Sequence, residues 1–171
     1  ILFYYFISGR TLSGGQFFGA LFLLPGYSSE FIGPGWTLSF EIYFYLCFSI
    51  AMALGLTRGI LALSAFFLTA VAVGLAWGPK TPAIHVFTNA LLIEFLLGAW
   101  IGYAVIKSIR ISRILGNVLL GLAAAGFLFG VGFGYHRPPT VVMWGIPSAI
   151  LVAGLVFNEN EGRVPRLIEQ Y

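Results

Sequence analysis

Residues 33–46 read GPGWTLSFEIYFYL, a Gly-Pro-Gly break that leads straight into a long apolar segment. Pro34 fixes its own backbone angle and its glycine neighbours permit a sharp bend, so we expect a helix to begin near Trp36. From there to about residue 56 the only formal charge is Glu41. Because an ionisable group in lipid is costly and usually functional, this carboxylate is the feature of the sequence that most needs explaining.

The composition is that of an integral membrane protein. Of the 171 residues, 59% are hydrophobic and 9% are charged, whereas a soluble domain has about 25% charged residues. Such a chain cannot cover a water-facing surface, so membrane lipid is its expected partner. The net charge of +3 requires no nucleic acid. The single cysteine, Cys47, can form neither an intrachain disulfide nor a cysteine metal cluster.

The apolar segments predict an all-α fold, a polytopic transmembrane helix bundle that forms a single membrane domain over residues 1–171. A spanning helix needs about 20 apolar residues, and turn residues separate several segments of that order. One shorter run is expected to form an interfacial or re-entrant half-helix, and residues 1–8 the end of a helix that begins upstream. The expected spans are 36–56, 59–77, 84–106, 113–134 and 140–158, the half-helix is 16–24, and the water-exposed tail is 159–171.

Basic residues in the loops predict the orientation. Lys and Arg are enriched in the cytoplasmic loops of membrane proteins. The Trp36 end of its helix would therefore face outward, to the periplasm or cell exterior. The cytoplasmic group comprises Arg58, Lys107, Arg110, Arg113, Arg163 and Arg166; the opposite side has Lys80 and Arg137, and also Arg10 if the half-helix does not cross the membrane.

Thr37, Glu41 and Tyr45 are four residues apart and would form a polar stripe on one face of a helix. A hydroxyl, a carboxylate and a phenol on an apolar helix must face protein or a water-filled pocket. In the functional interpretation, Glu41 orients or deprotonates a substrate hydroxyl, or steadies a catalytic base. In the structural interpretation, Glu41 lies near a helix N-terminus, where the dipole favours an anion.

Glu94 is expected near the middle of the 84–106 helix, the costliest depth for a charge. Ala90, Gly98 and Gly102 share its face at four-residue spacing, a seam of small residues that lets another helix approach closely. Glu94 should therefore look into a helix interface. There it would either serve a function, paired with a base or protonated, or fix the packing through an interhelical hydrogen bond.

Other motifs exclude several classes of site. His85 and His136 have no second ligand at metal-binding spacing, so a loop or headgroup role is the better interpretation. No glycine-rich stretch has the Lys-Ser/Thr of a phosphate-binding loop, and no Gly-x-Ser-x-Gly elbow is present. Gly126, Gly130 and Gly134 form a small-residue stripe that favours packing, and Pro147 is expected to kink the last helix.

Residues 36–46, WTLSFEIYFYL, resemble the signature of the acyltransferase-3 family. That signature reads Trp, Ser or Thr, Leu, two variable residues, Glu, two variable residues, then Phe-Tyr-Leu. Residues 89–98, NALLIEFLLG, resemble a later helix of the exopolysaccharide-production branch, and residues 137–154, which contain WGIP, resemble the helix after it. The motif departs at Ser49, where many members have proline.

The resemblance implies a membrane enzyme that moves acyl groups onto sugar hydroxyls of surface polysaccharides, in the inner (plasma) membrane of a bacterium. The donor would be acyl-CoA, most often acetyl-CoA, with no bound cofactor or metal, and the acceptor a glycan. Glu41 would be the catalytic acid that orients substrate or handles a proton. Trp36, Thr37, Tyr45 and, by a weaker likeness, Glu94 would bind substrate.

The resemblance also implies a missing partner for Glu41. The catalytic histidine of the family would lie upstream of Ile1, and neither His85 nor His136 matches its position. The chain would then be an internal fragment that is inactive by itself.

Two other classes of protein stay open. A fragment of a transporter or flippase would also contain half-helices and intramembrane acids, and would place Glu41 and Glu94 along one continuous pathway. A non-catalytic structural subunit would bury both acids, paired, in helix contacts with no cavity.

Overall fold

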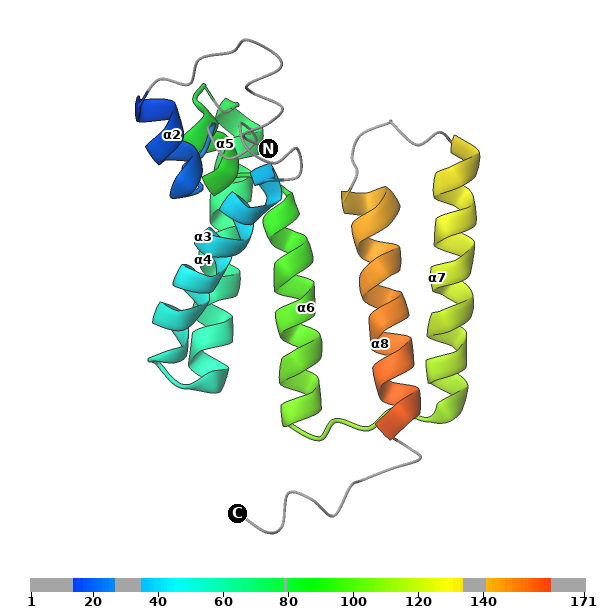
Figure 1. Cartoon of the computed structure of the whole chain (residues 1–171). Coiled ribbons are helices and arrows are strands. Elements are labelled where there is room, and N and C mark those ends of the chain that lie inside the picture. The colour runs from blue at the N-terminus through cyan, green and yellow to red at the C-terminus, as the bar shows by residue number, and fades with distance from the viewer. Residues whose placement is uncertain (1–13, 27–34, 79, 134–140, 161–171) are drawn as a thin grey trace. The chain divides into compact units, whose positions relative to one another are not determined.

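The computed structural model describes residues 14–26, 35–78, 80–133 and 141–160, and every regular element within these ranges is a helix (Figure 1). The all-α fold expected from the sequence is confirmed. The chain divides into two compact units, Ile1–Leu92 and Ile93–Tyr171. The helices are α2 (Gly14–Leu21), α3 (Gly35–Met52), α4 (Leu56–Trp77), α5 (Pro82–Phe87), α6 (Leu91–Ile106), α7 (Arg113–Phe133), the π-helix η1 (Val141–Gly145) and α8 (Ile146–Asn160).

Within these described ranges, four segments are long and apolar enough to cross a membrane. Helix α3 is apolar but shorter, because it ends at Met52 rather than near residue 56 as expected. The chain turns there: the N–H groups of Ala53, Leu54 and Gly55 donate to carbonyls three residues earlier, and Gly55 adopts a φ of 84°. The candidate spans are Leu56–Trp77, Pro82–Ile106, Arg113–Gly132 and Val141–Glu159.

Helices α3 and α4 pack as a hairpin through an aromatic core. Phe67 of α4 is fully buried, and its ring lies 6.0 Å from that of Phe44 and 5.8 Å from that of Tyr43. The buried residues of α4 recur mainly at four-residue spacing, which places them on one face. Near the turn, Gly59 lies so close to the Ala51 carbonyl that no side chain could fit between the two backbones.

A turn after α2 ties this short helix to α3. Leu23 adopts a left-handed φ of 53°, and the N–H of Leu24 donates to the Gly19 carbonyl at 2.8 Å. These features define a Schellman motif, a common helix ending. The buried Ser39 hydroxyl of α3 then donates to the Leu23 carbonyl at 2.7 Å. The half-helix expected at 16–24 is therefore a helix at Gly14–Leu21 followed by an anchored turn.

The segment expected as one helix at 84–106 is broken into α5 and α6. Thr81 accepts a hydrogen bond from the Ile84 N–H at the start of α5, and the Thr88 hydroxyl donates to the Ile84 carbonyl at its end. The Asn89 side chain then accepts from the Leu91 N–H at 2.9 Å and caps α6. Short polar side chains that bond nearby backbone groups compete with helix continuation, which explains the break.

Helices α7 and α8 run side by side in the second unit (Figure 1). Small residues of α7 lie at this contact. Ala123, one of the small residues of α7, is fully buried. A Cβ atom at Gly126 would lie 2.8 Å from Cγ of Pro147, and one at Gly130 would lie 3.2 Å from the Met143 carbonyl. The packing interpretation of this glycine stripe is thus supported for Gly126 and Gly130, whereas Gly134 lies outside the described residues.

The Gly126 contact predicts a selective loss of stability. Gly126→Ala would force a Cβ atom against the rigid Pro147 ring, and overpacking of this kind costs about 1–3 kcal/mol. Gly121→Ala on the same helix is the matched control, because its Cβ would meet nothing within 4 Å. Thermal unfolding of the intact protein in detergent, followed by circular dichroism, should show a lower midpoint for Gly126→Ala only. Equal midpoints for the two variants would contradict the described packing.

Candidate functional site

Glu41 lies in the second turn of α3, at the edge of the face that packs on α4. Its neighbour in sequence, Phe40, is 3% exposed, and Phe44 is 7% exposed, whereas Glu41 is half-buried. No hydrogen bond or ion pair joins the Glu41 carboxylate to another residue in the described part of the chain. A half-buried carboxylate without a partner is costly in an apolar segment, so this position is a candidate site.

The polar stripe of Thr37, Glu41 and Tyr45 turns away from the packed face of α3 toward the C-terminal end of the helix. Thr37 and Glu41 are both half-buried, but Tyr45 is 57% exposed. Thr37 and Glu41 thus share one edge of the helix, and Tyr45 lies on its outer surface. Trp36 belongs to the first turn of α3, but its side chain lies outside what the structure describes.

Helix α5 places a polar pair beside this part of α3. The ring of His85 lies 6.4 Å from that of Phe40 in an edge-on arrangement, and Phe87 packs 4.7 Å from Tyr43. Asn89 lies one turn after His85, and its Nδ2 is 3.1 Å from Nε2 of His85. Asn89 was not singled out from the sequence as a functional residue, although its four-residue spacing from His85 is a signal that could have identified it.

Glu94 lies in the first turn of α6 and not in the middle of a longer helix, because the chain breaks at residues 88–90. Its half-buried side chain packs against Gly145, the last residue of the π-helix η1: a Cβ atom there would lie 2.6 Å from Oε1 of Glu94 and 2.7 Å from its Cγ. Gly145 is a second residue that the sequence reasoning missed. Single π-helical turns are rare and occur often at functional sites.

Within the second unit, no described helix packs against Gly98 or Gly102 of the expected small-residue seam. A Cβ atom at Gly98 or at Gly102 would meet nothing within 4 Å. Glu94 therefore contacts the π-helix η1 of its own unit.

Helix dipoles act differently on the two acids. The dipole stabilises an anion within the first turn of a helix and falls off beyond it. Glu94 is in the first turn of α6, whereas α3 has no acid in its first turn and Glu41 comes later. Glu41 thus lies beyond the turn where the dipole acts most strongly, whereas Glu94 lies within that turn.

No metal cluster surrounds these residues within the described ranges. No group of three His, Cys, Asp or Glu side chains there could hold a metal ion. An open depression of about 470 Å³ lies on the outer face of α4, between Leu68 and Trp77. None of the residues singled out from the sequence lines it.

No family model and no solved structure matches the chain significantly. Among curated proteins, the chain is similar to the exopolysaccharide production protein ExoZ of Rhizobium meliloti (strain 1021), at 26% identity over 165 residues. The match covers 95% of this chain and 47% of that protein, so the chain spans about half the length of its relative. The likeness agrees with the resemblance of residues 36–46 to the acyltransferase-3 signature, and the family stays an expectation.

The contact between Glu94 and Gly145 predicts coupled effects on stability. Gly145→Ala should destabilise the intact protein by about 1–3 kcal/mol, because the new methyl group occupies the space of the Glu94 side chain. In a Glu94→Ala background the same substitution should cost at least about 1 kcal/mol less, as expected for residues in direct contact. A double-mutant cycle from denaturant unfolding measures this difference. Gly98→Ala, which meets open space, is the control, and additive effects of Gly145→Ala and Glu94→Ala would exclude the contact.

Proposed function

We propose that this chain forms part of a membrane O-acyltransferase with a role in exopolysaccharide production. The enzyme would transfer an acyl group, most simply acetyl, from acyl-CoA to a hydroxyl of a cell-surface polysaccharide or glycan precursor. Two lines of support converge: the acyltransferase-3-like signature lies on the apolar helix α3, and a relative over nearly the whole chain is named for exopolysaccharide production.

The half-buried position of Glu41 is the observation that carries the proposal. Its carboxylate has no described hydrogen-bond partner and lies beyond the first turn of α3. A carboxylate in this environment is stabilised if it accepts a hydrogen bond from a substrate hydroxyl or from the N–H of a catalytic imidazole. Either partner would give Glu41 a role in acyl transfer, as the group that orients the acceptor or the base.

The chemistry places a definite demand on the site. The acceptor oxygen forms a bond to the acyl carbon, the carbon–sulfur bond to CoA breaks, and the hydroxyl proton passes to a base and then to the leaving thiolate. In the proposal, Glu41 holds the reacting hydroxyl or the base in place, and Thr37, on the same edge of α3, binds the acceptor together with Trp36. Tyr45 would contribute from the outer surface of α3, where it is exposed.

The proposal gives Glu94 a role in binding the substrate. Its carboxylate packs on Gly145 at the π-helical turn, and a glycan hydroxyl that reached this turn could donate to it.

We propose further that the enzyme lies in a bacterial inner membrane with the Trp36 end of α3 outward, and that acyl-CoA arrives from the cytoplasm.

A transporter or flippase fragment is the second candidate, and the broken helices favour it. The 82–106 span is interrupted at residues 88–90, and a π-helical turn precedes α8. Discontinuous helices with intramembrane acids are typical of secondary transporters. The two functions differ in what Glu41 does: a transporter needs it for movement of the substrate, and an acyltransferase for formation of the ester.

Glu41→Gln tests the proposed function. The substitution keeps the shape of the side chain but removes its charge, so acyl transfer to the polysaccharide should fall about 100-fold or more. The measurement is the ester-linked acyl content of the polysaccharide from cells that produce the intact protein, together with its abundance in the membrane.

Glu159→Gln is the matched control, because Glu159 is exposed near the end of α8. It should retain normal acylation. Unchanged acylation in Glu41→Gln would exclude the proposed role. A normal acyl content on polysaccharide that accumulates inside the cell would favour the transporter.

A further inference from the structure

The loop between α6 and α7 is held at the bilayer surface. Helix α6 ends at Ile106 and α7 begins at Arg113, and both belong to candidate membrane spans. So short a connection between two spanning helices cannot extend far from the headgroup region. Residues 107–112, KSIRIS, are therefore presented to lipid headgroups along their whole length.

Backbone hydrogen bonds fix both ends of this loop. Ser108 adopts a left-handed φ of 53°, and the Ile109 N–H donates to the Ala104 carbonyl at 2.9 Å, which closes α6 with a Schellman motif. At the other end, the Ser112 hydroxyl accepts from the Leu115 N–H at 3.3 Å and caps α7. The loop thus has a defined conformation rather than a flexible one at each helix end.

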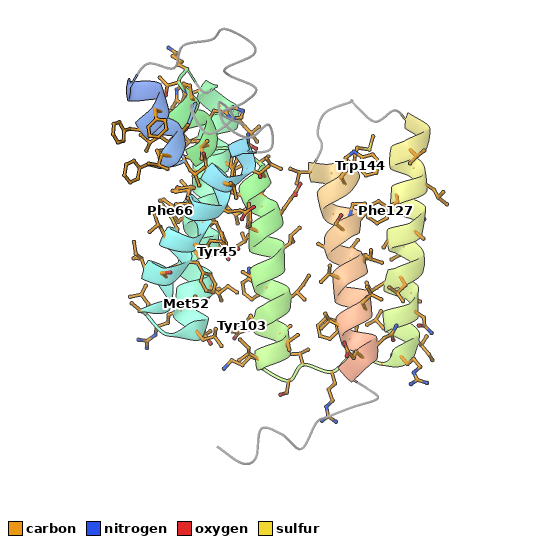
Figure 2. All side chains as sticks on the ribbon, viewed as in Figure 1. Tyr45, Met52, Phe66, Tyr103, Phe127 and Trp144 are labelled. Carbon is orange, nitrogen blue, oxygen red and sulfur yellow. The ribbon has the colours of Figure 1, made fainter. Side chains whose placement is uncertain are left out.

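Basic and apolar side chains alternate along the loop. Lys107, Arg110 and Arg113 are exposed, and between them Ile109 is 47% exposed. The ammonium of Lys107 lies 5.8 Å from the centroid of the Tyr103 ring, near the end of α6 (Figure 2). An alternation of cations with apolar residues is the pattern of segments that lie in a membrane interface.

Few acidic groups offset these cations. Glu159 is brought to the same end of the unit, because the neighbouring Asn158 of α8 donates to the Asn117 side chain of α7 at 3.0 Å. Within the described part of the second unit, the only other acid is Glu94, at the opposite end of α6. Lys107 and Arg110 against Glu159 leave an excess of positive charge along this loop.

We propose that this loop binds the phosphodiester headgroups of anionic phospholipids. Lys107 and Arg110 contact headgroup phosphates, and Ile109 reaches into the upper part of the acyl-chain region. The exposed Ile109 favours lipid over a soluble phosphate compound, because only lipid supplies an apolar phase next to the phosphate. The proposal does not rest on acyl transfer, and it adds a lipid-recognition surface to whatever reaction the protein performs.

The proposal is tested by lipid retention of the intact protein. Detergent-purified protein is mixed with equal amounts of phosphatidylglycerol and phosphatidylcholine, and the lipids that remain bound are counted by native mass spectrometry. Each basic residue at a membrane surface changes anionic-lipid binding by about fivefold. The double variant Lys107→Gln/Arg110→Gln should therefore lose about 20-fold or more of its preference for phosphatidylglycerol, and Ile109→Ser should lose part of it with no change of charge.

Lys80→Gln is the charge-matched control, since Lys80 is exposed in a different loop and its loss should reduce the preference by less than the loss of one cation from residues 107–112. Three outcomes would overturn the proposal: a double variant that retains the wild-type preference, a Lys80→Gln loss as large as that from one loop cation, or displacement of the bound lipid by an equal concentration of inorganic phosphate or acyl-CoA. The last result would assign the loop to a soluble phosphate ligand. Circular dichroism of each variant shows that the helices remain intact.

Discussion

Close approach of helices at glycine is the constraint on which this structure depends. Lipid tails are as apolar as leucine, so burial of apolar area cannot by itself hold helices together in a bilayer. Packing contacts must do so, and they strengthen when backbones approach closely. Gly59 meets the Ala51 carbonyl in the first unit, and Gly126 meets Pro147 and Gly154 meets Leu120 in the second. At Gly59 and Gly126 a larger side chain would separate the two helices, because its Cβ atom would meet backbone or a proline ring.

The same constraint explains where the chain interrupts its helices. Gly74 of α4 lies so close to Thr88 that a Cβ atom would be 2.6 Å from the Thr88 carbonyl oxygen. This approach brings α4 against the chain break before α6, where capping side chains satisfy backbone groups that the broken helix leaves free. In the second unit, Gly145 ends the π-helix and provides the space in which the Glu94 side chain lies. Irregular backbone and glycine contacts therefore occur together, because irregular backbone in a membrane must be covered by protein.

Much of the architecture could be predicted from the distribution of charge and turn residues, since a run of apolar residues between turns leaves few alternatives to a spanning helix. The break at residues 88–90 could not, because Thr and Asn are tolerated inside helices and only their side-chain hydrogen bonds show that they cap. The packing of Glu94 on Gly145 also could not be predicted from the sequence, because it depends on how segments distant in sequence meet. The exposure of Tyr45 was predictable in principle: a step of four residues advances about 40° beyond a full turn of an α-helix. A stripe that begins at Thr37 therefore drifts away from the packed face before it reaches Tyr45.

The two intramembrane acids illustrate why a charge in an apolar segment is not by itself evidence of chemistry. Glu94 has local compensation, since it lies in the first turn of α6, where the dipole favours an anion, and its side chain packs against a neighbouring backbone. These features offset much of the free-energy cost of placing the Glu94 carboxylate in an apolar segment, and a function for Glu94 needs evidence of its own. Glu41 has neither a first-turn position nor a described hydrogen bond, yet the fold leaves it half-buried beside the aromatic core of α3 and α4. A partner outside the described residues, whether substrate or base, is the simplest physical reason for a carboxylate at that position.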